Sequence, residues 1–395
     1  MTTRLSAFDL VPVPAGSDPQ TAMRNSLDLA ARVERAGYDR LWFGEHHLNP
    51  GVIGYSPAVT IALAGAVTST IRLGAGAVLA GHRTPLSVAE EFGLLEAAFP
   101  GRVDLGLGRA GLRKPTTRDD RRAAPEDATA HTTQQDRYTD EGLLLPKQPD
   151  LSKLLGSPRF TAQRSLLNQP GAQPGSYEQY VEDLLDLFHD RTVVESLPVT
   201  GATPEKALPQ IWVLGSSAGE SSEIAGRRGL RFGANYHVAP SHVTEAIEHY
   251  RNAFQPAADL AAPWVIVSAE VLVAETEEEA RHLAAGYDLW VHSIRSGQGA
   301  IHYPSPEQAL AEPLPEAKYP LVADRLKTRF VGTAEQVVQH LDVLQRATGA
   351  DELLISSITH NHERRARSFE LLAEAWQATE AAPSSRRLST TTHIA

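Results

Sequence analysis

The chain has 395 residues, of which 42% are hydrophobic and 22% are charged, a composition typical of globular proteins. It contains no cysteine, which excludes disulfides, cysteine-ligated zinc, iron–sulfur clusters and a thiolate nucleophile. Its 37 Lys and Arg residues face 48 Asp and Glu residues, and the net charge of -11 argues against a general binder of nucleic acid or anionic membranes.

Nothing in the sequence predicts targeting to a membrane. The first 20 residues lack the apolar core of a signal peptide. The most apolar stretch, 57–79, is interrupted by Arg72 and several hydroxyl residues, which makes it a poor membrane span. We therefore expect a cytoplasmic location.

Strand and helix patterns alternate along the chain, and helices open with Asp18-Pro19 and Ser56-Pro57, where Pro occupies the first helical position. The predicted strands are 5–11, 40–44, 71–79, 103–107, 211–214, 231–234, 265–273 and 352–356. The predicted helices are 19–36, 57–69, 85–99, 177–189, 217–228, 241–254, 277–296, 334–348 and 363–376. Two Pro-rich segments, 112–176 and 297–325, interrupt the alternation, and 382–395 has the composition of a frayed tail.

Eight strands that alternate with helices predict a parallel sheet, and eight units favour closure into a (β/α)8 barrel. We expect one barrel domain over residues 1–380. It carries a long insertion, 112–176, after strand four and a Pro-rich excursion, 297–325, before strand eight.

Catalytic groups of such barrels come from the carboxyl ends of the strands. Polar and small residues lie within or just after six of the predicted strands. These segments are Glu45-His46-His47, Gly74-Ala75-Gly76-Ala77, Gly108-Arg109-Ala110-Gly111, Gly215-Ser216-Ser217, Asn235-Tyr236-His237 and His360-Asn361-His362. We expect His237 and His360 to face a substrate pocket.

One group of these residues predicts a phosphate site. Ser216 and Ser217 offer hydroxyl groups next to the free amides of a helix N-terminus, which favours an anion. Arg109 adds a bidentate donor, and Gly111 leaves the neighbouring backbone accessible. The alternative is that Ser217 is only a helix cap and Arg109 only a surface ion pair.

A different function is also compatible with this region. Gly215-Ser-Ser217-Ala-Gly219 fits the G-x-S-x-G pattern between a strand and a helix, so a serine hydrolase with Ser217 as nucleophile and His360 as base is a rival. His360-x-His362 has no third ligand at a telling spacing, so we predict no metal site.

Several short motifs occur in a specific order. They are Trp42-Phe43-Gly44-Glu45-His46-His47, Ile71-Arg72-Leu73-Gly74-Ala75-Gly76-Ala77-Val78, Pro100-Gly101-Arg102-Val103-Asp104-Leu105-Gly106-Leu107-Gly108-Arg109, Val213-Leu214-Gly215-Ser216-Ser217 and Phe330-Val331-Gly332-Thr333. With these motifs the chain resembles the bacterial luciferase-like flavin monooxygenases over residues 1–111 and 205–380.

The resemblance implies a (β/α)8 barrel that uses reduced FMN, supplied by a separate flavin reductase, and O2. A C4a-hydroperoxyflavin would then oxygenate an aldehyde or another small organic substrate. The motifs place His46 at the family's active-site histidine and Glu45 at the adjacent flavin-contacting acid. They place Gly76-Ala77 at a cis peptide under the flavin ring, and Arg109, Gly111 and Ser216 at phosphate-binding positions.

The sequence also departs from the light-emitting members of that family. Gly108 replaces their reactive cysteine, Gly215 replaces a glutamate at the cofactor site, and the insertion, a candidate lid, matches little. Some relatives use the deazaflavin F420 in much the same pocket, which leaves an F420-dependent oxidoreductase as an alternative. A flavin-binding barrel without catalysis is another. By analogy with the family we expect a homodimer.

Overall fold

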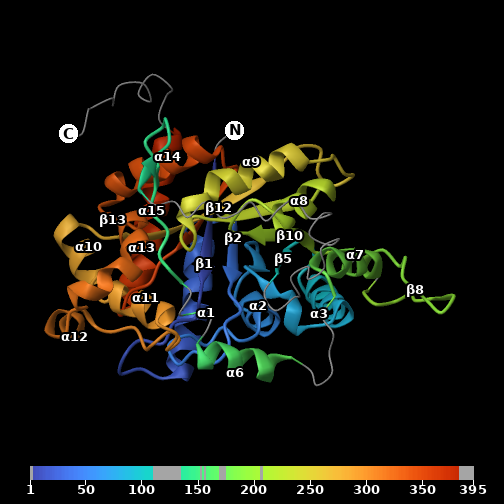
Figure 1. Ribbon diagram of the computed structural model, residues 1–395, viewed down its shortest axis with the longest axis horizontal. Coiled ribbons are helices and arrows are strands. Elements are labelled where there is room, and N and C mark those ends of the chain that lie inside the picture. Colours follow the sequence, from blue (N-terminus) through green and yellow to red (C-terminus); the bar gives the residue numbers. More distant parts are fainter. Residues whose placement is uncertain are drawn as a thin grey trace.

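The computed structural model describes residues 3–109, 135–151, 154, 157–168, 175–204 and 208–381 (Figure 1). Eight parallel strands form its barrel. They are β1 (Arg4–Asp9), β2 (Arg40–Phe43), β3 (Arg72–Ala75), β5 (Val103–Gly108), β10 (Gln210–Gly215), β11 (Arg231–Asn235), β12 (Val265–Val273) and β14 (Glu352–Ser356). The sheet closes where β10 pairs with β5, with Gln210 opposite Asp104. The predicted (β/α)8 barrel is confirmed.

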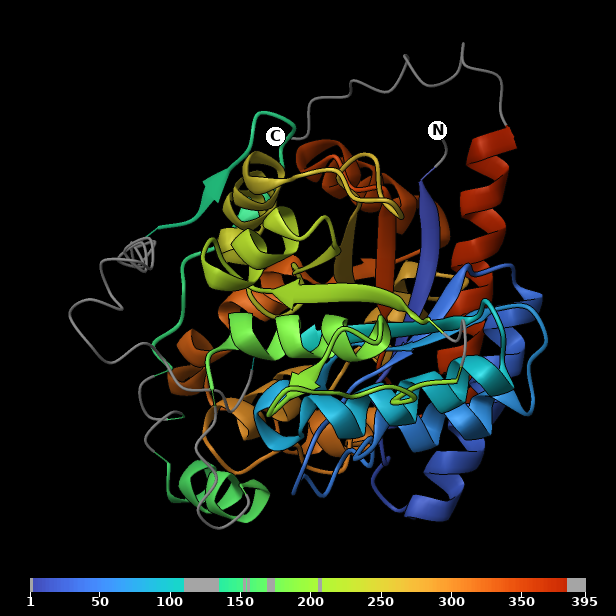
Figure 2. The ribbon, with the colours of Figure 1, turned by 90° about the vertical axis from the view of Figure 1, so that its right-hand side faces the viewer.

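Helices surround the barrel. They are α1 (Pro19–Arg35), α2 (Pro57–Gly65), α3 (Pro85–Ala98), α7 (Tyr177–Phe188), α8 (Glu220–Arg227), α9 (Val243–Ala253), α10 (Glu277–Leu283), α11 (Tyr287–Arg295), α14 (Ala334–Thr348) and α15 (His362–Ala381). The predicted start of the first helix holds, since Asp18 caps α1 by accepting a hydrogen bond from the Thr21 amide at 2.8 Å. Helix α15 packs against α1, so the last helix lies beside the first (Figure 2).

Side chains two residues apart on a strand share one face, which gives the barrel interior distinct layers. The middle layer is apolar and contains Phe8, Trp42, Trp212, Ile266 and Leu354. The rings of Trp42 and Trp212 meet edge to face with centroids 5.0 Å apart. This layer separates the two ends of the barrel.

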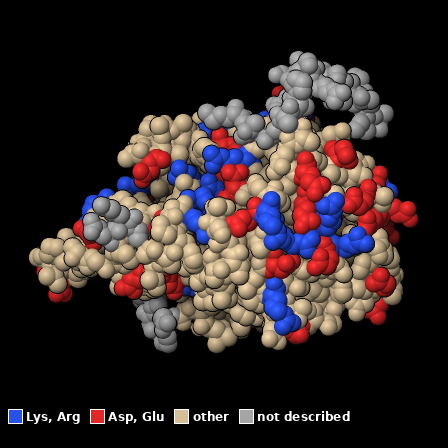
Figure 3. Space-filling model, turned by 180° about the vertical axis from the view of Figure 1, so that it is seen from behind, with Lys and Arg blue, Asp and Glu red and all other residues tan. Residues whose placement is uncertain are grey.

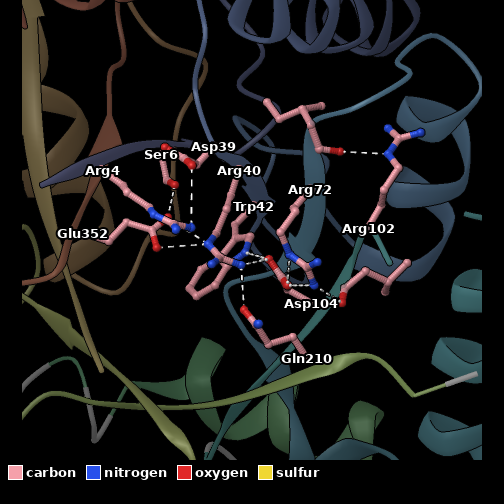
Figure 4. A network of polar contacts seen from close by, with 12 residues as sticks. Arg4, Ser6, Asp39, Arg40, Trp42, Arg72, Arg102, Asp104, Gln210 and Glu352 are labelled. Atoms are coloured by element: carbon pink, nitrogen blue, oxygen red, sulfur yellow. Dashed lines mark hydrogen bonds and ion pairs between the residues drawn. The ribbon is translucent and has the colours of Figure 1, made fainter. Parts of the chain in front are cut away.

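The layer at the amino ends of the strands is charged (Figure 4). Arg40 donates to Asp104 Oδ2 at 2.9 Å and to Glu352 Oε1 at 2.8 Å. Asp104 also accepts from Arg72 Nη2 at 2.6 Å and from Trp42 Nε1 at 3.0 Å. Asp104 and Glu352 are completely buried. Because each of these charges has a partner of opposite sign, the network can lie in the interior of the barrel.

Three predicted elements are wrong in detail. Predicted strand 71–79 divides into β3 and β4 (Val78–Leu79) at a cis Gly76–Ala77 peptide bond. Predicted helix 277–296 divides into α10 and α11 at Gly286, whose φ of +89° does not fit a helix interior. Predicted helix 217–228 begins only at Glu220, because Gly219 has a φ of +150°.

The two segments that interrupt the alternation contain short elements. The described part of the insertion contributes the antiparallel strands β6 (Arg137–Tyr138) and β7 (Leu144–Leu145) and helix α6 (Pro158–Leu167). The excursion contributes α12 (Pro306–Ala311), the 3-10 helix η3 (Glu316–Leu321) and α13 (Ala323–Thr328). The expectation of a lid concerns the insertion 112–176, of which 112–134, 152–153, 155–156 and 169–174 lie outside the described residues.

The remaining elements are small. Strands β8 (Val193–Val194) and β9 (Leu197–Pro198) form an antiparallel ribbon that follows α7. Strand β13 (Phe330–Gly332), which was not predicted, pairs with the carboxyl end of β12. The 3-10 helix η1 (Ala80–His82) follows β4, and the 3-10 helix η2 (Pro240–His242) precedes α9.

The surface carries both charges. On the face shown in Figure 3, Lys and Arg lie interspersed with Asp and Glu. In the part of the chain that the structure describes, no helix combines the length and the hydropathy that a membrane crossing needs.

Candidate active site

A cavity of about 670 Å³ opens at the carboxyl ends of the barrel strands, and this volume suits a small-molecule or cofactor site. Eight residues predicted from the sequence line it: His46, Gly76, Ala77, Arg109, Gly215, Ser216, Ser217 and His237. A groove of about 730 Å³ near β13 and α10 contains none of them. The cavity in the barrel mouth is therefore the candidate active site.

His46 follows β2 and lines this cavity. Its ring packs over Gly44, where a Cβ atom would lie 2.6 Å from the ring. The Nδ1 atom of His46 has no hydrogen-bond partner among the described residues. Burial, reinforced by the charge of His47, lowers the pKa of His46 to about 4. At pH 7 the ring is neutral and can accept a proton.

Glu45, predicted to contact the cofactor, is not among the residues that line the cavity, but it contacts the backbone of Leu79, which does line it. Its carboxylate accepts a hydrogen bond from the Leu79 amide at 2.9 Å and contacts His47 Nε2 at 2.7 Å. Burial raises the pKa of Glu45, but the hydrogen bonds with His47 and Leu79 outweigh this effect and the pKa is lowered. Glu45 is thus an ionised anchor for the backbone that follows Ala77.

Gly76 and Ala77 form a part of the cavity wall with almost no side chain. The Gly76 amide donates to the Phe43 carbonyl at 2.8 Å, which holds this backbone against β2. A Cβ atom on Gly76 would lie 3.1 Å from Trp42 and 3.2 Å from Phe8, so a larger residue would disturb the apolar layer below. The bare backbone suits the approach of a flat ring.

The predicted phosphate residues meet at one side of the cavity, after the adjacent strands β5 and β10. Arg109 Nη1 lies 3.1 Å from Glu220 Oε2, so the ion pair considered from the sequence exists within the cavity wall. Ser216 accepts a hydrogen bond from Asn235 Nδ2 at 3.3 Å. The Arg109 side chain remains 41% exposed and accessible to a ligand.

The helix N-terminus at this site differs from the prediction. Gly219 precedes the first residue of α8, and its amide donates to Ser222 Oγ at 3.1 Å. Ser217 therefore lies in the turn before the helix and does not cap it. Gly215 lines the cavity just before this turn, whereas Gly111 lies outside the described residues.

His237 follows β11 and lines the cavity, as predicted. Its Nδ1 atom lies 2.6 Å from Ser268 Oγ, and its ring is tilted against Phe8 with centroids 5.8 Å apart. Burial, followed by the charges of Arg325 and His46, lowers the pKa of His237 well below its usual value. The cavity thus has a second neutral imidazole.

His360 was predicted to face the substrate pocket, but it is not among the residues that line this cavity. Its Nε2 atom instead lies 2.9 Å from the Ala15 carbonyl oxygen. Ser217 and His360 are therefore not brought together, and the geometry does not support the hydrolase alternative. Two residues later, His362 contacts Asp28 Oδ2 at 2.7 Å, likewise away from the cavity.

Several cavity residues were not predicted from the sequence, among them Glu270 and Arg325. Glu270 was signalled by its position as the one carboxylate within the buried strand β12. Arg325 carried no such signal, because α13 comes to the cavity only through long-range packing. Its presence extends the site beyond the strand ends.

Known proteins agree with this fold. The family model for luciferase-like monooxygenases matches residues 3–134 and 186–352. The uncharacterized protein YvbT of Bacillus subtilis (strain 168) is 33% identical over 377 residues, which cover 95% of this chain and 97% of YvbT. The solved structure of apo-MsnO8 is 30% identical with a TM-score of 0.73, covering 95% of this chain and 98% of that one. The chain belongs to the luciferase-like monooxygenase family.

More distant structures share the fold alone. The oxygenating constituent of 3,6-diketocamphane monooxygenase from Pseudomonas putida, solved with FMN, is 17% identical with a TM-score of 0.61, covering 95% of this chain and 97% of that one. An F420-dependent secondary alcohol dehydrogenase is 14% identical with a TM-score of 0.58, covering 95% and 99%. Both kinds of cofactor therefore occur on this fold.

Proposed function

We propose that the protein is a monooxygenase that uses reduced FMN and O2 to oxygenate a small organic molecule. The observation that carries this proposal is the convergence of Arg109, Ser216 and Ser217 on the cavity that His46 and Gly76 also line. An anion site, a flat wall and a neutral imidazole in one cavity are what FMN and its chemistry require.

The residues present fit FMN. Arg109, Ser216 and the amide groups before α8 would hold the phosphate. Gly76 and Ala77 would take the isoalloxazine ring, because they give the cavity wall almost no side chain, and a Cβ atom at residue 76 would disturb Trp42 and Phe8. When bound, reduced FMN supplies the activation of O2.

The protein contributes orientation, exclusion of water and one base. His46 is neutral at pH 7 and presents an unpaired Nδ1 atom, so it can take a proton during oxygen transfer. Phe8, Leu10 and Val52 form an apolar wall of the same cavity, which limits access of water to the reacting groups.

The test is a titration with oxidised and reduced FMN, followed by O2 consumption and product analysis with a panel of aldehydes. The proposal expects saturable FMN binding and an oxygenated product that contains label from 18O2. Tight FMN binding without O2 consumption above that of free reduced FMN would identify the non-catalytic flavin-binding barrel instead.

F420 is the second candidate, since an F420-dependent dehydrogenase has the same fold. In that case the protein would transfer a hydride and would not incorporate O2. Absorption spectra after mixing with each reduced cofactor separate the two. An F420 spectrum that changes on addition of an alcohol or ketone, with no response to FMN, would favour this alternative.

We further propose a homodimer and a separate flavin reductase as partners. The neighbouring helices α2 and α3 expose the apolar side chains of Val59, Leu63, Leu86 and Leu94, and the turn after α2 exposes Val67, all of which a second copy would cover. Analytical ultracentrifugation should show a dimer that Leu94→Asp dissociates. Oxygenation should depend on an added reductase and NADH or NADPH.

A further inference from the structure

One arginine of the cavity differs from the other buried arginines. Among the described residues the buried arginines are Arg40, Arg295, Arg325, Arg329 and Arg365. Four of these arginines have a carboxylate oxygen within 4 Å. The pairs are Arg40 with Glu352, Arg295 with Asp324, Arg329 with Glu270, and Arg365 with Asp9. Within the described part of the chain Arg325 has none, although buried charges in proteins are usually paired.

The protein satisfies Arg325 only in part. Its Nε and Nη2 atoms donate to the Tyr287 hydroxyl at 3.2 and 2.8 Å, while Nη1 donates to no group of the described residues. Burial raises the pKa of Tyr287, so its neutral phenol does not compensate the charge. Glu270 lies closer to another cation, with Arg329 Nε 3.9 Å from its Oε1, and it also accepts from the Ile358 amide at 3.2 Å.

Arg325 lines the same cavity as His46 but not the proposed phosphate site. Its neighbour Glu270 belongs to β12, which β11 separates from β10, whereas Ser216 follows β10 itself. The cavity wall also includes Leu10, Val52, Trp290 and Ile294, which are apolar. The cavity thus offers a second cationic site together with an apolar surface.

We propose that Arg325 binds a carboxylate group of the substrate, whose apolar body lies against Leu10, Val52, Trp290 and Ile294. The guanidinium presents a planar pair of N–H donors that matches a carboxylate. This inference rests on the proposed function, since it assigns the substrate class to the same cavity. It makes the enzyme an oxygenase of acidic rather than neutral small molecules.

The test uses two probes with one carbon skeleton, 4-phenylbutyrate and 4-phenylbutan-1-ol, titrated calorimetrically into protein saturated with FMN. The wild type should bind the acid at least about tenfold more tightly than the alcohol, the size expected of a charge-assisted hydrogen bond. Arg325→Gln should bind both equally, and Arg325→Lys should retain part of the preference. Arg109→Gln should keep the full preference, because its charge belongs to the phosphate site.

Equal binding of the two probes by the wild type would overturn the inference. This test needs no variant, so it stands even if Arg325→Gln does not fold. A preference that survives in folded Arg325→Gln, with a wild-type near-UV circular dichroism spectrum, would also overturn it. If FMN does not bind, the same two probes are titrated into Arg109→Gln without FMN. Because this variant lacks the other cavity arginine as a binding site for the acid, the titrations still test Arg325. Absence of FMN binding by the wild type contradicts the proposed function, and absence of an acid preference in the wild type contradicts this inference.

Discussion

At the amino ends of the strands, Arg40 meets the carboxylates of Asp104 and Glu352 (Figure 4). At the carboxyl ends, by contrast, His46 and Arg325 keep polar atoms without a hydrogen-bond partner among the described residues. Both ends lie in one barrel and are separated by the same apolar layer. Buried polar groups that are paired fix a structure, and those left unpaired have a cost that a ligand can offset.

In this fold the groups available for binding and catalysis therefore lie at the carboxyl ends of the strands. The sequence did not single out charged residues within the strands, such as Arg40 and Asp104, as functional. The structure shows that these two residues form an ion pair with each other. The groups with unpartnered polar atoms lie elsewhere: His46 follows a strand, and Arg325 belongs to the excursion 297–325. If this division is right, substitutions at the two ends should affect different properties.

The largest expected effect is on activity at the carboxyl end. His46→Ala should lower the oxygenation rate roughly 10²–10⁴-fold, because it removes the base, while FMN binding and the free energy of unfolding change little. Single-turnover kinetics with reduced FMN measure the rate. His360→Ala is the matched control and should oxygenate like the wild type, since His360 lies outside the cavity. Wild-type turnover of His46→Ala would remove the assignment.

The next effect is on stability at the amino end. Asp104→Ala should lower the free energy of unfolding by about 3–5 kcal/mol, because it leaves Arg40 with one carboxylate fewer and Trp42 Nε1 without an acceptor. Urea denaturation measures this change. Asp186→Ala removes an exposed partner of Arg191 and should cost less than about 1 kcal/mol. Equal losses for the two variants would contradict the contrast between the barrel ends.

A pH dependence of stability should follow from His46. Its pKa is about 4 in the folded protein and 6.5 in the unfolded chain, so the unfolded chain binds more protons between these values. Stability should therefore fall as the pH falls from 6.5 toward 4, and His46 alone should contribute about 2–3 kcal/mol of this loss. Urea denaturation at pH 7.5 and 4.5 should show a smaller difference for His46→Gln than for the wild type. Identical differences would mean that His46 titrates normally.

The smallest expected effect concerns Glu220, whose carboxylate pairs with Arg109 and would compete with a phosphate. Glu220→Gln should tighten FMN binding by up to about fivefold, since exposed pairs contribute about 0.2–1 kcal/mol. Glu223→Gln, on the same helix but paired with Arg227, is the control and should leave FMN affinity unchanged. Fluorescence quenching of FMN measures both. Weaker binding by Glu220→Gln would show that the carboxylate helps to hold the ligand.

Most of the barrel could be predicted from sequence because its signals are local. The apolar run 265–273 and the Pro start of α1 specify a strand and a helix without reference to distant residues. Once the strands are placed, their carboxyl ends identify His46 and Arg109. Where a predicted element is wrong, a single backbone feature is responsible, as at Gly286, whose φ of +89° ends a helical pattern that the side chains would continue.

The rest of the site depends on tertiary contacts. The segment 297–325 has little periodicity, and Arg325 reaches the cavity because Asp324 forms a buried ion pair with Arg295 of α11 (Nη2 to Oδ2, 2.8 Å). No local pattern encodes that pairing. The rule of strand ends also selected His360, but it cannot tell that the ring turns to the Ala15 carbonyl.

If this cavity holds a flavin by its phosphate, FMN and riboflavin, which differ only in that group, should bind with different affinities. The wild type should bind FMN at least about tenfold more tightly, and Arg109→Gln should lose most of this preference. Equal affinities in the wild type, or an undiminished preference for FMN in Arg109→Gln, would contradict the account.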